Sequence, residues 1–243
     1  MKVVCIVQAR VGSSRLPGKV LKNICGKTVL EHDINRLKLS SMIDEIIIAT
    51  TVESQDDKIV DEAKRLGVKY FRGSEKDVLS RYYHAAMESN PDIVVRVTSD
   101  CPCIDYAILD NMIRLFKENK FDYINNTSER TFPRGYDVEV FTFQALELAY
   151  KSATKDYERE HVTPYLYDCN NNFKCFTYKN NVDYSKYRIT LDTEEDLQLI
   201  TIIYEKLFNN KGYFLLDDVV EFLEKNQNIA KINQEIEQKK LGE

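Results

Sequence analysis

The sequence lacks the features that define several large classes of protein. Only eight of its 243 residues are glycine and five are proline, while 43% are hydrophobic, so collagen-like and disordered chains are excluded. Lysine and arginine (34) do not exceed aspartate and glutamate (39), and the resulting charge of −5 argues against nucleic acid or a membrane surface as partner. No apolar run approaches the roughly 20 residues that span a bilayer. We therefore expect a cytoplasmic globular protein with a single domain over residues 1–243.

Metal-binding cysteine pairs are also missing. The six cysteines are scattered and none forms a CxxC pair, so neither a disulfide framework nor a zinc site is expected. The closest two, Cys101 and Cys103, are separated by Pro102, which disfavours joint coordination of one zinc ion. We expect the cysteines to serve as small buried hydrophobic side chains.

The first half of the chain alternates between strand-like and helix-like segments. Short apolar runs predict strands at residues 3–7, 45–50, 68–71 and 92–97. Helical spacing of apolar residues predicts helices at residues 28–39, 56–66, 76–87 and 107–117. This alternation indicates βαβ units and a mostly parallel sheet in a three-layer α/β fold.

After residue 120 the alternation stops. Strands are predicted at residues 121–124, 138–143, 173–178 and 187–191, and helices at residues 144–151, 157–166, 194–207 and 216–225. The second half is therefore expected to cap or extend the parallel sheet. The polar tail, residues 233–242, is expected to be frayed or loosely docked.

The junction after the first strand, residues 8–19, combines small residues with cations. Gly12 permits close approach of a ligand to the backbone, and Ser13 and Ser14 add hydroxyl and amide donors. Residues 1–30 contain six cations and no acidic residue. A positive loop in an acidic chain indicates a small polyanion such as a nucleoside triphosphate. The spacing fits neither GxxxxGK[ST] nor GxGxxG, and a solvated basic loop is the alternative.

Two aspartates at strand ends are candidates for binding Mg²⁺. Asp100 follows the predicted strand 92–97, and Asp192 follows the predicted strand 187–191. Mg²⁺ takes one or two carboxylates together with phosphate oxygens and water, and ligands of doubly wound sheets bind at the carboxyl ends of strands. Thr193 fits a helix N-cap, so the acidic residues that follow it are explained without a metal.

Five segments resemble one protein family when taken in order. They are residues 8–19, 96–105, 135–141, 159–161 and 191–197. Together they resemble the cytidylyltransferases of the spore coat polysaccharide biosynthesis type, relatives of the CMP-KDO and CMP-sialic acid synthetases. The resemblance implies a three-layer αβα, Rossmann-like nucleotidyltransferase fold with a mostly parallel mixed sheet. It also implies Mg²⁺-dependent transfer of CMP from CTP to an acceptor, with release of pyrophosphate.

The residue pattern and the resemblance together assign candidate roles. The catalytic residues would be Arg15, Lys19, Asp100 and Asp192, with Asp100 and Asp192 binding Mg²⁺. The nucleotide would be bound by Gln8, Ala9, Arg10, Gly12, Ser13, Ser14, Arg15, Lys19, Thr50, Arg72, Gly73, Ser74, Arg81 and Ser99. The acceptor would be bound by Arg134, Asp137, Glu139, Glu160, His161 and Arg188.

The acceptor-binding portion, roughly residues 120–190, is the least transferable part. Tyr136 stands where the family usually has leucine, so the acceptor of a relative is not carried over. Asp137 and Glu139 either bind the acceptor or form structural ion pairs with Arg134 or Arg159. His161 either acts on the acceptor or makes a buried hydrogen bond. Relatives are often dimers, so a homodimer is expected, with residues 136–143 as a candidate interface.

Several functions remain open at this point. We favour transfer of CMP to a small phosphorylated or phosphonate acceptor, such as a phospho-amino acid (for example phosphoglutamine) or a phosphosugar, in surface polysaccharide synthesis. The cations Arg130, Arg134 and Arg159 favour such an anion. The main alternative acceptor is a nonulosonic or octulosonic sugar acid. A nucleotide-sugar glycosyltransferase is disfavoured because Asp100 does not begin a DxD motif. A non-catalytic nucleotide-binding protein is disfavoured because both candidate metal acids are present.

Overall fold

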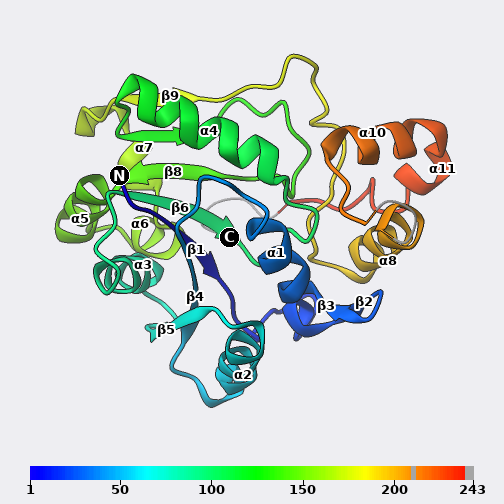
Figure 1. Cartoon of the computed structure of the whole chain (residues 1–243), viewed down its shortest axis with the longest axis horizontal. Helices are drawn as coiled ribbons and strands as arrows, with labels where there is room; N and C mark the ends of the chain where they lie inside the picture. Colours follow the sequence, from blue (N-terminus) through cyan, green and yellow to red (C-terminus); the bar gives the residue numbers. More distant parts are fainter. Residues whose placement is uncertain (209–211, 239–243) are drawn as a thin grey trace.

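A seven-stranded mixed sheet forms the centre of the computed structural model, which describes residues 1–208 and 212–238 (Figure 1). The strands are β1 (Val3–Gln8), β4 (Glu45–Thr51), β5 (Lys69–Gly73), β6 (Ile93–Thr98), β7 (Tyr123–Asn125), β8 (Glu139–Thr142) and β9 (Cys175–Thr177). Their order is β5-β4-β1-β6-β8-β7-β9. The first four strands pair in parallel, whereas β8 is antiparallel to both β6 and β7.

The apolar runs predicted as strands lie at the centre of this sheet. In β1 the residues from Val3 to Val7 are fully buried, as expected for a parallel strand covered on both faces. The register places Gln8 beside Ala49 of β4 and Thr98 of β6. The carboxyl ends of these central strands therefore meet at one edge of the sheet.

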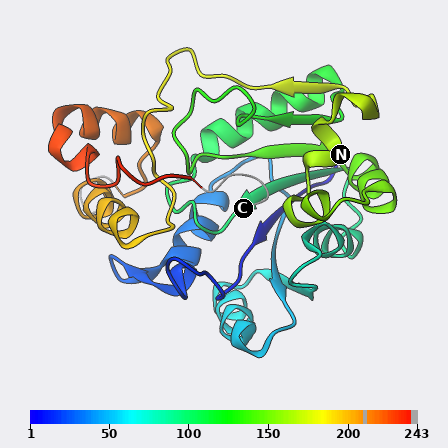
Figure 2. The ribbon, with the colours of Figure 1, turned by 180° about the vertical axis from the view of Figure 1, so that it is seen from behind.

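Helices cover both faces of the sheet. The main ones are α1 (Val29–Leu37), α2 (Asp57–Leu66), α3 (Val78–Met87), α4 (Tyr106–Asn119), α5 (Phe143–Ser152), α8 (Glu194–Ile203) and α10 (Leu216–Lys225). Buried residues of α1, α2 and α4 pack on one face, visible in front in Figure 1, and those of α3 and α5 pack on the other, seen from behind in Figure 2. The expected three-layer α/β fold with a mostly parallel mixed sheet is confirmed.

Shorter elements complete the chain. They are η1 (Lys19–Leu21), the two-stranded sheet of β2 (Asn23–Ile24) and β3 (Lys27–Thr28), η2 (Ser54–Asp56), α6 (Asp156–His161), α7 (Pro164–Tyr167), η3 (Cys169–Asn171), the π-helical turn η4 (Tyr204–Phe208) and α11 (Gln227–Ala230). A third apolar cluster joins α8 and α10 to the β2–β3 sheet. No helix within residues 1–208 and 212–238 has the length and apolarity needed to cross a membrane.

Two predicted elements are wrong. Residues 187–191 form no strand: Arg188 makes only an isolated bridge to Arg134, because the partner backbone turns away at Gly135, whose φ is +100°. The helix predicted over residues 157–166 is divided into α6 and α7. Val162, with a φ of +72°, ends the first helix, and Pro164 begins the second because it has no N–H to continue the hydrogen-bond ladder.

Three further expectations also need correction. The cysteines are not uniformly buried, since Cys169 and Cys175 are exposed. Tyr136 and Phe141 are fully buried within the chain, so residues 136–143 offer no large apolar surface for a dimer. The tail is docked at least as far as Asn233, which is only 2% exposed. Residues 234–238 are described as well, and Gln238 accepts a hydrogen bond from Arg188, whereas residues 239–242 of the predicted frayed segment lie outside the described residues.

Candidate functional site

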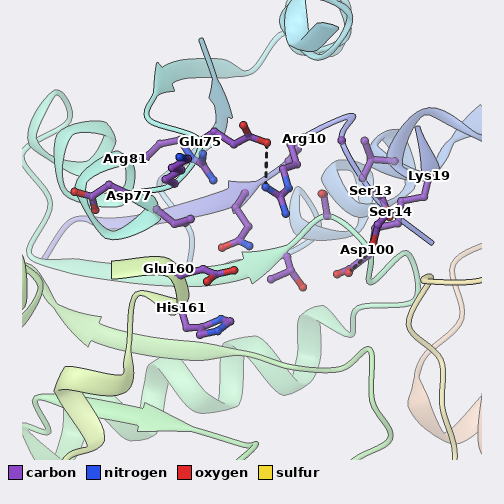
Figure 3. Close-up of a pocket in the computed structure, with 18 of the residues that line it drawn as sticks. Arg10, Ser13, Ser14, Lys19, Glu75, Asp77, Arg81, Asp100, Glu160 and His161 are labelled. Atoms are coloured by element: carbon purple, nitrogen blue, oxygen red, sulfur yellow. Dashed lines mark hydrogen bonds and ion pairs between the residues drawn. The ribbon is translucent and has the colours of Figure 1, made fainter. Parts of the chain in front are cut away.

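A cavity of about 960 Å³ opens at the carboxyl ends of β1 and β6 (Figure 3). The predicted site residues that line it are Gln8, Ala9, Arg10, Gly12, Ser13, Ser14, Arg15, Lys19, Arg81, Ser99, Asp100, Glu160, His161 and Asp192. Its position at the strand ends is where open α/β sheets bind their ligands.

The loop after β1 is held in place by hydrogen bonds to its own backbone and to Asp56. The Val11 N–H donates to Oδ1 of Asp56 (2.7 Å), and the carbonyl of Val11 accepts from the N–H of Gly18 (3.0 Å). Gly18 adopts a φ of +67°, a conformation open to glycine at no steric cost, and leads directly into η1. Leu16, 2% exposed, anchors the loop in the core. As a result Arg15 and Lys19 face the cavity from a closed loop.

Lys19 joins the two candidate metal-binding aspartates. Its Nζ lies 2.7 Å from Oδ2 of Asp100 and 2.7 Å from Oδ1 of Asp192, residues 92 positions apart in the chain (192 − 100). The second oxygen of Asp192 forms an ion pair with Nη2 of Arg15 (2.8 Å) and accepts a hydrogen bond from Nη2 of Arg188 (2.9 Å). These contacts bring the four predicted catalytic residues together at one end of the cavity.

The charges at this end stabilise one another. Burial disfavours the ammonium of Lys19, but the charges of Asp100 and Asp192 and its hydrogen bonds to them raise its pKa. Burial likewise opposes ionisation of Asp100, but the charge of Lys19 and its hydrogen bond lower the pKa of this carboxyl group. Asp100 and Lys19 are therefore both charged at neutral pH.

The same two aspartates have the geometry to hold a divalent cation. No group of three or more His, Cys, Asp or Glu side chains suited to a metal occurs within the described residues. Mg²⁺, however, is commonly bound by one or two carboxylates plus substrate phosphates. The ammonium of Lys19 touches an oxygen of each aspartate, so a single cation can span them. The donor set fits Mg²⁺ brought in with a nucleotide.

A buried acid that the sequence reasoning missed lies near Asp100. Asp33 of α1 is fully buried, and neither of its carboxyl oxygens has a hydrogen-bond partner within the described residues. Burial and the negative charge of Asp100 raise the pKa of Asp33 well above its usual range. Both effects favour the protonated, uncharged form of Asp33. The sequence could have indicated Asp33 by its position next to Leu30 and Ile34, which form the apolar face of the predicted helix.

The opposite end of the cavity combines charged residues of the loop after β1 with those at the start of α3 (Figure 3). Arg10 pairs with Glu75 at 3.2 Å. Arg81 is 3% exposed and donates through Nη1 to the carbonyl of Ser74 (2.6 Å), but forms no salt bridge within the described chain. Burial and the like charge of Arg10 lower the pKa of Arg81. An anion in the cavity would relieve this uncompensated positive charge.

Four predicted nucleotide-binding residues do not line the cavity. Thr50 is fully buried, and Arg72 donates to the carbonyls of Thr51 and Glu53 and pairs with Asp57. Gly73 and Ser74 lie beside Arg81: a Cβ on Gly73 would be 3.1 Å from the Arg81 side chain. These residues support the β4–β5 end of the site from outside the cavity.

Six predicted acceptor-binding residues divide into two groups. Glu160 and His161 of α6 line the cavity, and burial lowers the pKa of His161 although the charge of Glu160 opposes this. The other four, Arg134, Asp137, Glu139 and Arg188, do not line it. Arg188 is 8% exposed and bound to acidic partners.

The two acids predicted as acceptor ligands have structural partners that differ from those expected. Asp137 accepts two hydrogen bonds from Arg130 (2.6 and 3.0 Å) instead of pairing with Arg134 or Arg159. Glu139 forms an ion pair with Arg96 and accepts from the Tyr123 hydroxyl (2.5 Å) and the Thr163 hydroxyl (2.7 Å). Both carboxylates therefore have structural partners in this conformation, and neither lines the cavity.

Several cavity-lining residues were not assigned to the site from the sequence. They are Val20, Glu75, Lys76, Asp77, Val78, Arg96, Thr98, Asp156 and Arg159. Arg159 is bound to both oxygens of Asp77, the N-cap of α3 (3.1 and 2.5 Å), which joins α6 to α3. Arg96 donates to Oε1 of Gln8 (3.2 Å) from the next strand. Their position could have indicated them, since most of these residues follow β1 or β5 or lie in the second half of β6.

Comparison with known proteins adds a family match over nearly the whole chain. A family model described as Cytidylyltransferase matches residues 4–240. The chain is 41% identical over 248 residues to an uncharacterized protein of Methanocaldococcus jannaschii, covering 100% of this chain and 99% of that protein. It is 31% identical over 211 residues to the spore coat polysaccharide biosynthesis protein SpsF of Bacillus subtilis, covering 84% and 87%.

Solved structures agree with these sequence matches. A cytidylyltransferase from Leptospira borgpetersenii serovar Hardjo-bovis is 41% identical, with a TM-score of 0.92, over 98% of this chain and 100% of that one. A CMP:2-keto-3-deoxy-manno-octonic acid synthetase in complex with CTP has a TM-score of 0.68 at 17% identity, over 85% of this chain and 100% of that one. The second similarity is one of fold alone.

Proposed function

The chain belongs to the cytidylyltransferase family, and we propose that it transfers CMP from CTP to a small phosphorylated or phosphonate acceptor and releases pyrophosphate. The similarity to a spore coat polysaccharide biosynthesis protein supports a place in the synthesis of a surface polysaccharide. The observation that carries the proposal is the joining of Asp100 and Asp192 by Lys19, with Arg15 beside them. This arrangement suits a triphosphate and its metal ion.

The proposed reaction is an in-line displacement at the α-phosphorus of CTP. An acceptor oxygen forms a bond to the α-phosphorus while the bond to the leaving pyrophosphate oxygen breaks. Arg15 and Lys19 would stabilise the negative charge that develops on the pyrophosphate. Mg²⁺ held by Asp100 and Asp192 would neutralise and orient the α-phosphate. A triphosphate offers Lys19 new anionic partners, so the ammonium can leave the two carboxylates when nucleotide binds.

The phosphorylated acceptor is supported by its chemistry and by the charge of the cavity. Phosphate oxygens are already ionised, so their attack needs no general base, and none of the four residues proposed as catalytic has to accept a proton. Arg81 lines the cavity without an acidic partner in the described chain, and an anion would compensate its charge. The cations first considered for this role contribute less, since Arg130 and Arg159 are paired with Asp137 and Asp77.

A sugar acid is the second candidate acceptor, and the α6 side of the cavity favours it. Glu160 and Asp156 line the cavity and form neither hydrogen bonds nor salt bridges within the described chain, so their oxygens are available to hydroxyl groups. A hydroxyl acceptor must lose a proton as it attacks. His161, whose pKa is lowered by burial, is neutral at pH 7 and could accept that proton.

The proposed portion for acceptor binding and dimerisation, residues 120–190, contributes α6 to the cavity. Its exposed apolar side chains are candidates for a homodimer contact, and include Leu148, Tyr157, Tyr167 and Phe176. Sedimentation of the purified chain tests the dimer directly: a single species of 28.4 kDa would rule it out.

Pyrophosphate release tests the proposed function. Each of the four nucleoside triphosphates is offered with Mg²⁺ and a panel of phosphosugars, phospho-amino acids, phosphonates and sugar acids. We expect release with CTP and a phosphorylated or phosphonate acceptor, and none without Mg²⁺. Release with a sugar acid alone would replace the acceptor class. CTP binding without release for any acceptor would contradict the proposal.

A further inference from the structure

Asp192 is held by side chains and not by a strand. The segment before it forms an isolated bridge at Arg188, and the Leu191 N–H donates to the carbonyl of Asp100 (2.8 Å), but no strand continues to Asp192 to fix its side chain. Its Oδ1 faces Lys19, while its Oδ2 accepts a hydrogen bond from Arg188 and forms an ion pair with Arg15. The orientation of this carboxylate therefore depends on where the two guanidinium groups lie.

Arg188 and Asp196 form a buried pair beneath Asp192. Nε and Nη2 of Arg188 donate to the two oxygens of Asp196 (2.9 and 3.1 Å), and Asp196 is fully buried. Asp196 also accepts the backbone N–H groups of Asp192 (2.9 Å) and Thr193 (3.0 Å). The pair thus fixes both the backbone and the side chain of Asp192. Such charge-assisted, bidentate contacts are among the strongest hydrogen bonds in proteins.

The C-terminal segment, residues 233–238, completes this pair. Nδ2 of Asn233 donates to the carbonyl of Arg188 (2.9 Å) and to Oδ1 of Asp196 (2.7 Å), which accounts for both of its hydrogens. Oε1 of Gln238 accepts from Nη1 of Arg188 (2.6 Å). In Figures 1 and 2 the chain turns back after α11 toward the middle of the molecule, which brings these residues to the site.

We propose that residues 233–238 are a positioning element of the active site, in which Asn233 and Gln238 hold Arg188 and thereby the carboxylate of Asp192. This inference rests on the proposed function, because it assumes that Asp192 binds the metal ion that accompanies the nucleotide. Without Asn233, Oδ1 of Asp196 and the carbonyl of Arg188 lose a buried donor. Without Gln238, Nη1 of Arg188 loses its acceptor. In either case the Arg188–Asp196 pair loses one of its supports, and the carboxylate of Asp192 is held less firmly with its Oδ1 toward Lys19.

Two point variants and a matched control test the proposal in the full-length protein. Asn233→Ala removes both hydrogen bonds, and Gln238→Ala removes one at an exposed position where the fold is not at risk. Gln234→Ala, at an exposed neighbouring position, is the control. The readouts are kcat, KM for CTP, the Mg²⁺ concentration for half-maximal rate, and Mn²⁺ binding by EPR in the presence of CTP without acceptor.

Substitution of a residue that hydrogen-bonds to a metal ligand typically lowers metal affinity or activity by about 10- to 100-fold. For Asn233→Ala we expect kcat to fall about tenfold and Mn²⁺ affinity to weaken by about as much, with KM for CTP within about twofold of wild type. Gln238→Ala should show a smaller loss of the same kind. Gln238→Glu, which keeps the acceptor oxygen, should restore wild-type Mn²⁺ affinity.

The outcomes separate this inference from the proposed function. If Asn233→Ala lowers only the melting temperature and leaves kcat and Mn²⁺ affinity unchanged, residues 233–238 have a purely structural role. If Asn233→Ala does not fold, wild-type values for Gln238→Ala overturn the positioning role by themselves. A wild-type protein that neither binds Mn²⁺ with CTP nor releases pyrophosphate contradicts the proposed function instead.

Discussion

The two ends of the cavity use charged residues differently. At the end proposed for the triphosphate, Lys19 contacts two aspartates of which neither belongs to its own loop, and Asp192 contacts three cations. At the end that contains α6, two of the arginines that line the cavity are bound to acids outside the proposed reacting centre: Arg159 to Asp77 and Arg96 to Glu139.

This difference distinguishes side chains whose proposed role is to bind a ligand from side chains whose partners stabilise the fold. Lys19 and Asp100 neutralise each other now and can exchange partners when a triphosphate and a cation arrive together. Glu139 is bound by Arg96 of β6, Tyr123 of β7 and Thr163, so its partners are fixed by the fold. The number of charged residues in a segment is therefore a poor guide to its ligand. Whether each charged side chain already has a structural partner is the better guide.

The largest effect is expected at Asp100. Asp100→Asn keeps the shape of the side chain but removes the charge that faces Lys19, so turnover should fall by about 1,000-fold. Pyrophosphate release measures this, and circular dichroism checks that the fold is kept. Asp61→Asn, which alters an exposed acid on α2 paired with Lys64, is the control and should match wild type. Near-normal turnover of Asp100→Asn would remove Asp100 from the metal site.

A smaller loss is expected for Lys19→Met. Without the ammonium, charge on the leaving pyrophosphate is less well stabilised, and kcat/KM for CTP should fall about 100-fold. Binding of Mn²⁺ without nucleotide should become tighter, because Asp100 and Asp192 lose the cation that now lies between them. Lys22→Met, which changes a neighbouring lysine paired with Glu194, serves as control. Unchanged CTP affinity and rate would exclude Lys19 from the site.

The pH dependence sharpens the comparison at the α6 end. Burial lowers the pKa of His161, so this histidine is neutral at pH 7 and becomes protonated only as the pH falls below the usual value of about 6.5. If the acceptor is a sugar hydroxyl, kcat/KM should decrease about tenfold for each pH unit below the lowered pKa of His161. His161→Gln should abolish this pH dependence. With a phosphorylated acceptor, both proteins should show the same profile in that range.

The smallest effect is expected for Arg130→Gln. Arg130 and Asp137 form a partly exposed pair, for which about 1 kcal/mol of stability or less is typical. Turnover and acceptor KM should stay within about twofold of wild type, since neither residue lines the cavity. A large rise in acceptor KM would show that Asp137 acts on the acceptor and would break the distinction between the two ends.

Much of the fold and of the nucleotide end could be predicted from the sequence. The continuous apolar run of β1 and the periodic apolar stripes on α1 and α4 are clear patterns, and Thr193 caps its helix as expected. The family inferred from five short segments is confirmed by the match over residues 4–240. The strand predicted at residues 187–191 is wrong because alternation of apolar residues indicates burial of one side of a segment but does not identify a strand with which it pairs.

The acceptor end and the C-terminal segment could not be predicted in the same way. The expected partners of Asp137 and Glu139 were chosen by proximity in sequence or motif, whereas the true partner of Glu139 comes from the neighbouring strand β6. Asn233 stands in a polar, charged tail whose composition resembles that of frayed termini. Its burial depends on two acceptors that lie 37 and 45 residues earlier in the chain.

By itself, the sequence determined the three-layer architecture, the place of the cationic loop after β1 and the aspartates that lie near it, because periodicity, strand ends and capping residues are local properties. Only the tertiary structure decided which charged side chains pair with one another. It placed Lys19 between two carboxylates that are distant in sequence, and it gave Arg159 and Glu139 structural partners. It also brought Asn233 into contact with Asp196, which holds the backbone of Asp192. The physical reason is that a charge or a buried amide is defined by its partners, and here those partners come from distant parts of the chain.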